Sequence, residues 1–199
     1  MCNIRKVAGL DIGNYNGSWD KLFGKSIKVL RKFSQFLLIT DGDTSILDSL
    51  KGKVKVLVQR CLWHIPYQAK YVLWQDGVKH KSAEWLQVMS ELMEICAIRP
   101  LVDCEKTIKK MIESKRKRLE SVIQYCLSNG YPHTASYLEN AMPDMFTAIE
   151  KRLKGKTTSK VERVMRTINM RVNVSKWSIA GALNVTKIRL AYYYNGFDA

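Results

Sequence analysis

The sequence is short of acidic residues, and this shortage is its most informative property. Its 199 residues include 33 lysines and arginines but only 18 aspartates and glutamates, which leaves a formal net charge of +15 at pH 7. A surplus of that size bears on binding partners rather than on fold. It favours nucleic acids or anionic membrane surfaces as partners, and it predicts that binding weakens as salt rises.

Long apolar runs are also missing. The most apolar short stretch covers residues 36–39, whereas a helix needs roughly 20 apolar residues to cross a bilayer. We therefore expect no membrane partner, and nucleic acid remains as the counterpart of the positive charge. Because 46% of the residues are hydrophobic, the chain can still bury a core.

Cysteine is scarce and scattered. The five residues are odd in number, so free thiols in a reducing cytosol explain them better than a disulfide framework, and we expect a cytoplasmic location. Cys61 and His64 are spaced as in half of a zinc site, but no second close pair completes it. We interpret them as a buried thiol and a core histidine, and keep a small zinc-dependent protein as an alternative.

The first third of the chain alternates strand and helix patterns. The predicted elements are a strand over 6–12, a helix over 18–30, a strand over 36–40, a helix over 45–50 and a strand over 53–59. This order, with short links, predicts an α/β fold with a parallel sheet and right-handed crossovers. Ligands of such sheets gather at the carboxyl ends of the strands, where Asp41 and Arg60-Cys61 are expected.

From about residue 66 the pattern becomes helical. The predicted helices cover 66–75, 81–99, 103–129, 132–141, 143–154, 160–172 and 178–194. We predict three parts: a sheet-containing part over 1–65, an all-helical insertion over 66–156 and C-terminal helices over 157–199.

Two carboxylates are candidates for chemistry, and each has a structural alternative. Asp41 follows an apolar strand and precedes a glycine, a rigid setting in which a carboxylate can hold a divalent cation. The alternative is ordinary Asp-Gly turn chemistry, with Asp43 capping the next helix. Glu162 fits a capping box with Ser159 and can pair with Arg166 one turn on, so its spacing alone favours a structural role.

Basic residues concentrate in the helix predicted over 103–129. A charge run on a helix is usually a solvated face, and three glutamates are interleaved here, but the total charge favours contact with nucleic acid. The candidates for phosphate contact are Lys106, Lys109, Lys110, Lys115, Arg116, Lys117, Arg118, Arg163 and Arg166.

The order of these motifs resembles that of one family. The motifs are Thr40-Asp41-Gly42-Asp43, Val58-Gln59-Arg60-Cys61-Leu62-Trp63-His64, Thr158-Ser159-Lys160-Val161-Glu162-Arg163 and Lys176-Trp177-Ser178. They resemble the C-terminal two-thirds of bacterial insertion-sequence transposases of the Mutator-like superfamily, which are DDE enzymes with a ribonuclease H-like fold. Lys160 is a departure, since asparagine is usual there.

The resemblance implies a function and a role for each motif. Asp41 would be the second acid and Glu162 the third in a site for two Mg²⁺ ions, with their carboxylates within about 8 Å of each other. Cys61 and His64 would be the family's Cys-x-x-His pair beside that site. The implied activity is phosphodiester hydrolysis and strand transfer on nucleoid DNA, by a possible homo-oligomer. The implied fold is a partial ribonuclease H-like domain interrupted by the helical insertion.

The first acid of the site has only two early candidates, Asp11 and Asp20. We expect that acid on strands upstream of this sequence, so that the chain is a transposase fragment that is inactive alone. The alternative is a non-catalytic, basic nucleic-acid-binding protein derived from a mobile element.

Overall fold

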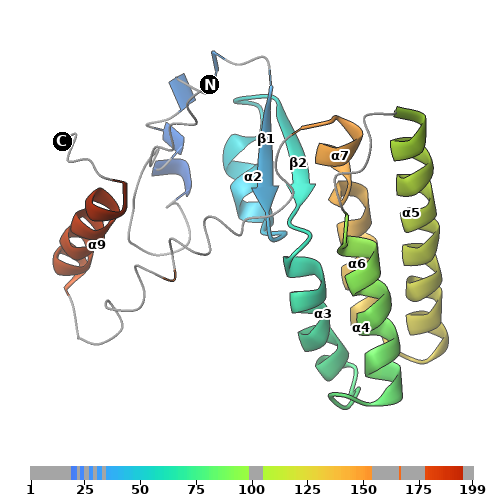
Figure 1. Cartoon of the computed structure of the whole chain (residues 1–199). Helices are drawn as coiled ribbons and strands as arrows, with labels where there is room; N and C mark the ends of the chain where they lie inside the picture. Colours follow the sequence, from blue (N-terminus) through green and yellow to red (C-terminus); the bar gives the residue numbers. More distant parts are fainter. Residues whose placement is uncertain are drawn as a thin grey trace. The chain divides into compact units, whose positions relative to one another are not determined.

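The computed structural model describes residues 19–21, 23–24, 27–28, 31–32, 35–98, 105–153, 166 and 178–194 (Figure 1). The chain divides into two compact units. The first unit comprises Met1–Phe36, Asp43–Val56 and Ser159–Ala199, and the second comprises Leu37–Gly42 and Leu57–Thr158. The described residues are mostly helical and contain one small sheet.

The sheet of the described residues has two parallel strands, β1 (Phe36–Thr40) and β2 (Val56–Arg60). The Phe36 amide donates to the Lys55 carbonyl at 3.2 Å, and the Cys61 amide donates to the Thr40 carbonyl at 2.8 Å. The strand starts therefore pair with each other, as do the strand ends, which confirms the predicted parallel pairing. The strand predicted over 6–12 lies outside the described residues, and a ribonuclease H-like arrangement remains a prediction.

The predicted start of β2 is wrong by three residues. The amides of Lys53 and Val54 donate to the Leu50 carbonyl at 3.0 and 3.4 Å, which closes a turn where extended chain was expected. Gly52 in this turn has a φ of +71°, a conformation that glycine adopts without steric cost. Valines alternate with other residues both in this turn and in β2, so the sequence pattern does not show where the turn ends and the strand begins.

Helix α2 (Thr44–Leu50) belongs to the first unit and begins as predicted. The Asp43 carboxylate accepts bonds from the Ser45 amide at 2.9 Å and the Ser45 hydroxyl at 2.7 Å, which confirms the predicted N-cap. Asp20, an early acid candidate, pairs with Lys53 at 3.0 Å on the surface of the same unit. Helix α9 (Ile179–Tyr194) is found where a helix was predicted over 178–194, whereas most of 160–172 lies outside the described residues.

The described helices of the second unit are α3 (His64–Gln75), α4 (Ala83–Cys96), α5 (Glu105–Ser128), α6 (Pro132–Ala141), the 3-10 turn η1 (Met142–Asp144) and α7 (Thr147–Glu150). The first four agree within three residues with the predicted helices. The single helix predicted over 143–154 is wrong. Pro143 lies in η1, and the Met145 carbonyl and the Ala148 amide bond to the side chain of Gln59 instead of to helical partners. The short α7 ends at Glu150, and Arg152 follows with a φ of +52°.

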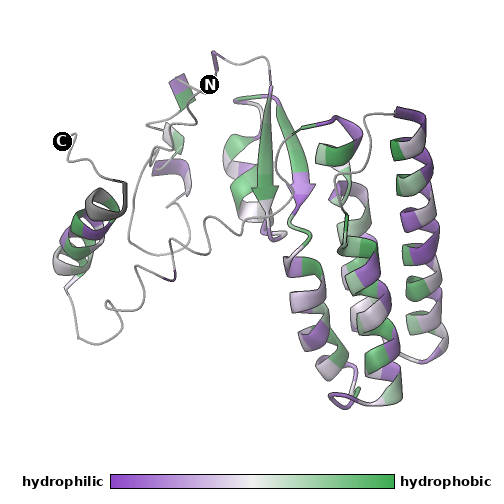
Figure 2. Cartoon of the chain, viewed as in Figure 1, coloured by the Kyte–Doolittle hydropathy of each residue, from purple (hydrophilic) through white to green (hydrophobic). Residues whose placement is uncertain are grey.

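The core of the second unit lies between α3, α4, α5 and α6, each of which has an apolar and a polar side (Figure 2). Helix α6 packs against both α3 and α5. The fully buried side chains include Ile65, Leu73, Leu92, Leu119, Leu138 and Phe146. Burying one such side chain typically stabilises a fold by about 1.5–3 kcal/mol, so this core can hold the end of the sheet in place.

Asp76 links the end of α3 to the start of α6. Its carboxylate accepts bonds from the His133 amide at 2.9 Å and from the Thr134 amide and hydroxyl at 2.8 and 2.7 Å. These amides belong to the first turn of α6, where no helical carbonyl is available to them. The acid is therefore engaged inside the unit. No helix in the described ranges has both the length and the apolar character needed to span a bilayer.

Candidate functional site at the carboxyl end of the sheet

The carboxyl end of the sheet brings together three segments of the second unit. Asp41 follows β1, and Arg60 ends β2, as the sequence predicted. The third segment runs from α6 through η1 to α7, and no motif in the sequence pointed to it. The contacts of two consecutive side chains, Gln59 and Arg60, join these segments.

Arg60 connects the two predicted motifs. Its guanidinium Nη1 donates to the Asp41 carbonyl at 3.5 Å, and Nη2 donates to the Asn140 carbonyl at 3.1 Å. Nη2 also lies 3.9 Å from the Asp144 carboxylate, and the Arg60 side chain is only 13% exposed. Gly42 has a φ of +115°, and a Cβ there would lie 1.5 Å from Nη1. The guanidinium thus lies over the glycine, in a place that any side chain at position 42 would occupy.

Gln59 attaches the end of β2 to the segment before α7. It is fully buried. Its Nε2 donates to the carbonyls of Arg60 and Met145, each at 2.6 Å, and its Oε1 accepts the Ala148 amide at 2.8 Å. Both ends of the amide are therefore bonded, as a buried polar group requires.

Asp41 is exposed beside this junction. The Thr40 hydroxyl donates to Asp41 Oδ1 at 3.3 Å and accepts the Gly42 amide at 3.2 Å, which orders the turn after β1. Glu162, Arg163 and Asp11 lie outside the described residues, so the approach of Asp41 to Glu162 remains a prediction. In the described ranges, no three His, Cys, Asp or Glu side chains are grouped so that they could hold a metal ion.

Cys61 and His64 lie at the start of α3 and are both buried. The His64 amide donates to the Cys61 carbonyl at 3.0 Å, and the His64 ring packs edge-on against Trp63 with centroids 4.8 Å apart. The short spacing of the pair is thus that of a chain turning from a strand into a helix. The Cys61 amide bonds the Thr40 carbonyl next to the Asp41 turn, and the role that the resemblance implies for the Cys-x-x-His pair remains a prediction.

The interior behind Asp41 disfavours charge. Burial raises the pKa of Tyr137 to about 12, although the nearby Arg60 lowers it. Its hydroxyl has no hydrogen-bond partner among the described residues. Burial also raises the pKa of Asp144, again against the effect of Arg60. Sequence reasoning missed Tyr137, Asn140 and Asp144, because none of them belongs to a recognisable motif.

Three of the basic candidates on α5 are used inside the second unit. Arg118 binds the Glu91 carboxylate through Nη2 at 2.7 Å and Nε at 3.1 Å, and Arg116 binds Glu150 at 2.6 Å. Lys115 donates to the backbone carbonyl of Glu94 on α4. These side chains hold α5 against its neighbours. The charge pattern of the sequence could not show whether they are used in this way or lie on a solvated face.

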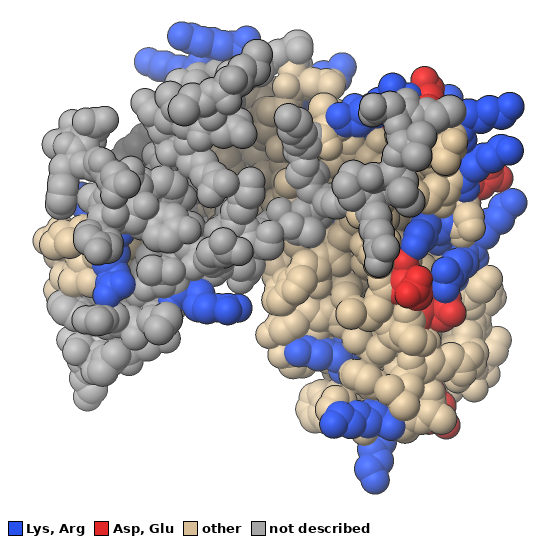
Figure 3. All heavy atoms as spheres, viewed as in Figure 1, with Lys and Arg blue, Asp and Glu red and all other residues tan. Residues whose placement is uncertain are grey.

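The other basic candidates on α5 are exposed and mixed with acids. Lys109 and Lys117 pair with glutamates four residues earlier, at 3.1 and 3.3 Å. Lys106 and Lys110 form no ion pair with the described part of the chain. On the right of Figure 3, where α5 lies, blue side chains predominate and a few red ones lie among them. Arg166 is exposed in the first unit, and phosphate contact by any of these residues remains a prediction.

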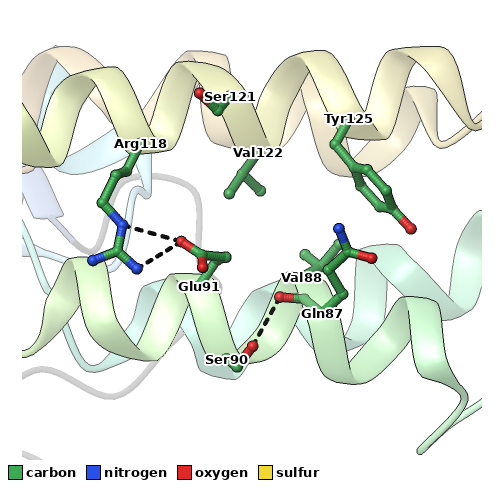
Figure 4. A pocket seen from close by; sticks show the side chains of 8 residues that line it. All are labelled: Gln87, Val88, Ser90, Glu91, Arg118, Ser121, Val122 and Tyr125. Carbon is green, nitrogen blue, oxygen red and sulfur yellow. Dashed lines mark hydrogen bonds and ion pairs between the residues drawn. The ribbon is translucent and has the colours of Figure 1, made fainter.

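A groove of about 330 Å³ lies between α4 and α5. The pair formed by Arg118 and Glu91 closes one end of it, and Tyr125 lies at the other (Figure 4). Polar, apolar and charged side chains line this groove, and the charges of Arg118 and Glu91 offset each other.

Comparisons of the chain with protein-family models, with curated proteins and with solved structures found no match. The functional proposal below therefore rests on the geometry at the carboxyl end of the sheet.

Replacing Gln59 by alanine should destabilise the protein strongly. The substitution leaves the Met145 carbonyl and the Ala148 amide buried without their partner, and each such loss costs about 1–3 kcal/mol. We expect the free energy of unfolding in urea to fall by about 2–5 kcal/mol. The exposed Gln75→Ala on α3 is the matched control, with an expected change within about 0.5 kcal/mol. Equal effects of the two substitutions would contradict the role given to Gln59.

The raised pKa of Asp144 predicts a pH dependence. Its usual value is 3.8, and the folded protein favours the neutral carboxyl because burial raises the pKa. The contribution of Asp144 to stability is therefore greatest below pH 3.8 and is lost as the pH rises through the raised value. The Asp144→Asn variant stays neutral and lacks this loss.

The difference between the unfolding free energies of the wild type and Asp144→Asn should consequently decrease between about pH 3.5 and pH 6. Urea denaturation at several pH values measures it. Asp48→Asn, at an exposed position of α2, controls for the removal of one negative charge. A difference that is flat or increases with pH is the contrary result.

Proposed function

We propose that the chain is part of a DDE-type transposase, with a ribonuclease H-like arrangement around the sheet. The observation that carries this proposal is the contact of Arg60 with the Asp41 carbonyl above Gly42. It gives a physical reason for both the Asp-Gly motif after β1 and the Gln-Arg-Cys motif at the end of β2, which meet at the same end of the sheet. The guanidinium of Arg60 holds the backbone of Asp41 and fits there only because Gly42 has no side chain.

Asp41 suits the role of a metal ligand. Its carboxylate is exposed at the end of β1, on a backbone held by the Thr40 hydroxyl and by Arg60. Carboxylate oxygens are the ligands that Mg²⁺ prefers. When bound, a pair of such ions would polarise the phosphodiester and stabilise the attacking and leaving oxygens of an in-line displacement. Arg60 acts as a positioning residue, because its guanidinium bonds the backbone of Asp41 and of Asn140.

The site needs carboxylates from outside the described residues. The described ranges contain no complete metal-binding group, so Asp41 requires Glu162 and a further acid, for which Asp11 is a candidate within this sequence. Glu162 at the start of its predicted helix would be oriented by its own cap. We therefore place the cutting and joining of DNA strands at the carboxyl end of β1.

The alternative is a non-catalytic nucleic-acid-binding protein, supported by the net charge of +15. It relies on one continuous basic face. On α5, however, Lys115, Arg116 and Arg118 bind groups of the protein itself, and the exposed lysines are mixed with glutamates. This arrangement favours the first proposal over the second.

Binding of Mn²⁺, a substitute for Mg²⁺, tests the proposed function without requiring turnover. We expect the full chain to bind Mn²⁺ in calorimetry, and both Asp41→Asn and Glu162→Gln to lower the affinity by at least about tenfold. Asp48→Asn removes an equal charge at an exposed position of α2 and should leave the affinity unchanged. The proposal fails if the wild type binds no Mn²⁺, or if all three variants bind it equally.

A further inference from the structure

Helix α3 carries a row of exposed aromatic rings. Trp63 precedes the helix, and Tyr67, Tyr71 and Trp74 follow at intervals of four, four and three residues, which places all four on one face. They are 46%, 38%, 48% and 75% exposed, respectively. We call these four residues the aromatic row. Large exposed apolar patches on a protein surface mark interaction sites.

The core does not explain the aromatic row. Helix α3 is anchored by a different face, on which Ile65, Ala69 and Leu73 are fully buried against the other helices of the second unit. The rings of the row contribute no residue to that core cluster. The packing of the core therefore does not explain why these four rings are present on the surface.

The rings are ordered among themselves. Trp63 and Tyr67 stack with centroids 4.9 Å apart and planes at 17°, and Tyr67 meets Tyr71 edge to face at 5.6 Å. The Tyr71 and Tyr67 hydroxyls are hydrogen-bonded at 3.2 Å. Trp63, Tyr67 and Tyr71 are thus held in a fixed arrangement, and Trp74, the most exposed of the four, extends the row.

The charges along the row are positive. Lys70 Nζ lies 3.9 Å from the centroid of Tyr67 and 4.9 Å from that of Tyr71. Helix α3 contains no acidic residue, and the Asp76 that follows it is engaged by the start of α6. Lys79 and Lys81, which follow the helix in the chain, are also exposed. A polyanion is therefore the partner that this surface complements.

We propose that the aromatic row binds unpaired nucleic-acid bases by stacking, with Lys70 contacting the phosphate backbone. Aromatic rings beside basic side chains are the usual means of binding single strands without sequence preference. Eleven residues of helix correspond to about 16 Å, the length of up to about five stacked nucleotides. The inference goes beyond the proposed function, since the metal site requires no unpaired bases.

The test is the binding of the full chain to a fluorescent thymidine oligonucleotide about ten nucleotides long, followed by anisotropy. We expect Trp74→Ala and Tyr71→Ala each to weaken binding roughly 5- to 150-fold, the equivalent of about 1–3 kcal/mol per stacked base. Trp74→Phe should bind better than Trp74→Leu, because only phenylalanine keeps a flat ring. Met93→Ala, an exposed apolar residue on α4, is the control and should bind as the wild type does.

An abasic oligonucleotide of the same length separates stacking from charge. It keeps the phosphates but cannot stack on any ring, and we expect the wild type to bind it at least as weakly as Trp74→Ala binds the thymidine strand. Equal binding of the abasic and thymidine strands would overturn the inference, as would unchanged binding by Trp74→Leu. The inference would also be overturned if Trp74→Ala dissociated an oligomer of the wild type without weakening oligonucleotide binding. The aromatic row would then be a contact between copies of the protein.

These results are independent of the metal site. A chain that binds Mn²⁺ but not the oligonucleotide would refute the stacking inference alone. A chain that binds the oligonucleotide but not Mn²⁺ would refute the proposed function alone.

Discussion

The arrangement of the second unit depends on the bonds made by Gln59 and Arg60 at the end of β2. Neighbouring residues of a strand point to opposite faces, so the two side chains reach different parts of the same segment. Gln59 bonds the backbone at Met145 and Ala148, while Arg60 bonds that of Asn140 and reaches across to Asp41. A strand end held in this way can present an exposed carboxylate in a fixed position, which is what a metal-dependent reaction requires.

The positive charge of the chain serves more than one purpose. Some basic side chains, such as Arg60 and Arg118, hold segments of the protein together through carbonyl and carboxylate groups. Others, such as Lys106 and Lys110, are exposed on α5. Lys70 belongs to neither class, because it lies over the rings of α3. Net charge alone therefore overstates the surface that is available to nucleic acid.

The sequence predicted local structure better than it predicted the site. The apolar run of β1 and the cap by Asp43 depend on neighbouring residues, and both were found as expected. The contacts of Arg60 with Asn140 and Asp144 could not be predicted, because they join positions about 80 residues apart. One partner is a backbone carbonyl, which every residue type possesses. The helix predicted over 143–154 was wrong for a similar reason, since the Met145 carbonyl and the Ala148 amide bond to Gln59, which is 86 and 89 residues away in the chain.

We propose that the carboxylates of Asp41 and Glu162 share one pair of cations. Fe²⁺ that occupies Mg²⁺ sites generates radicals with ascorbate and peroxide, and these cut the polypeptide beside the ion. We expect cuts close to positions 41 and 162 in the wild type, both suppressed by excess Mg²⁺ and both absent from Asp41→Asn. Cuts at only one of the two positions, or cuts that persist in Asp41→Asn, would contradict it.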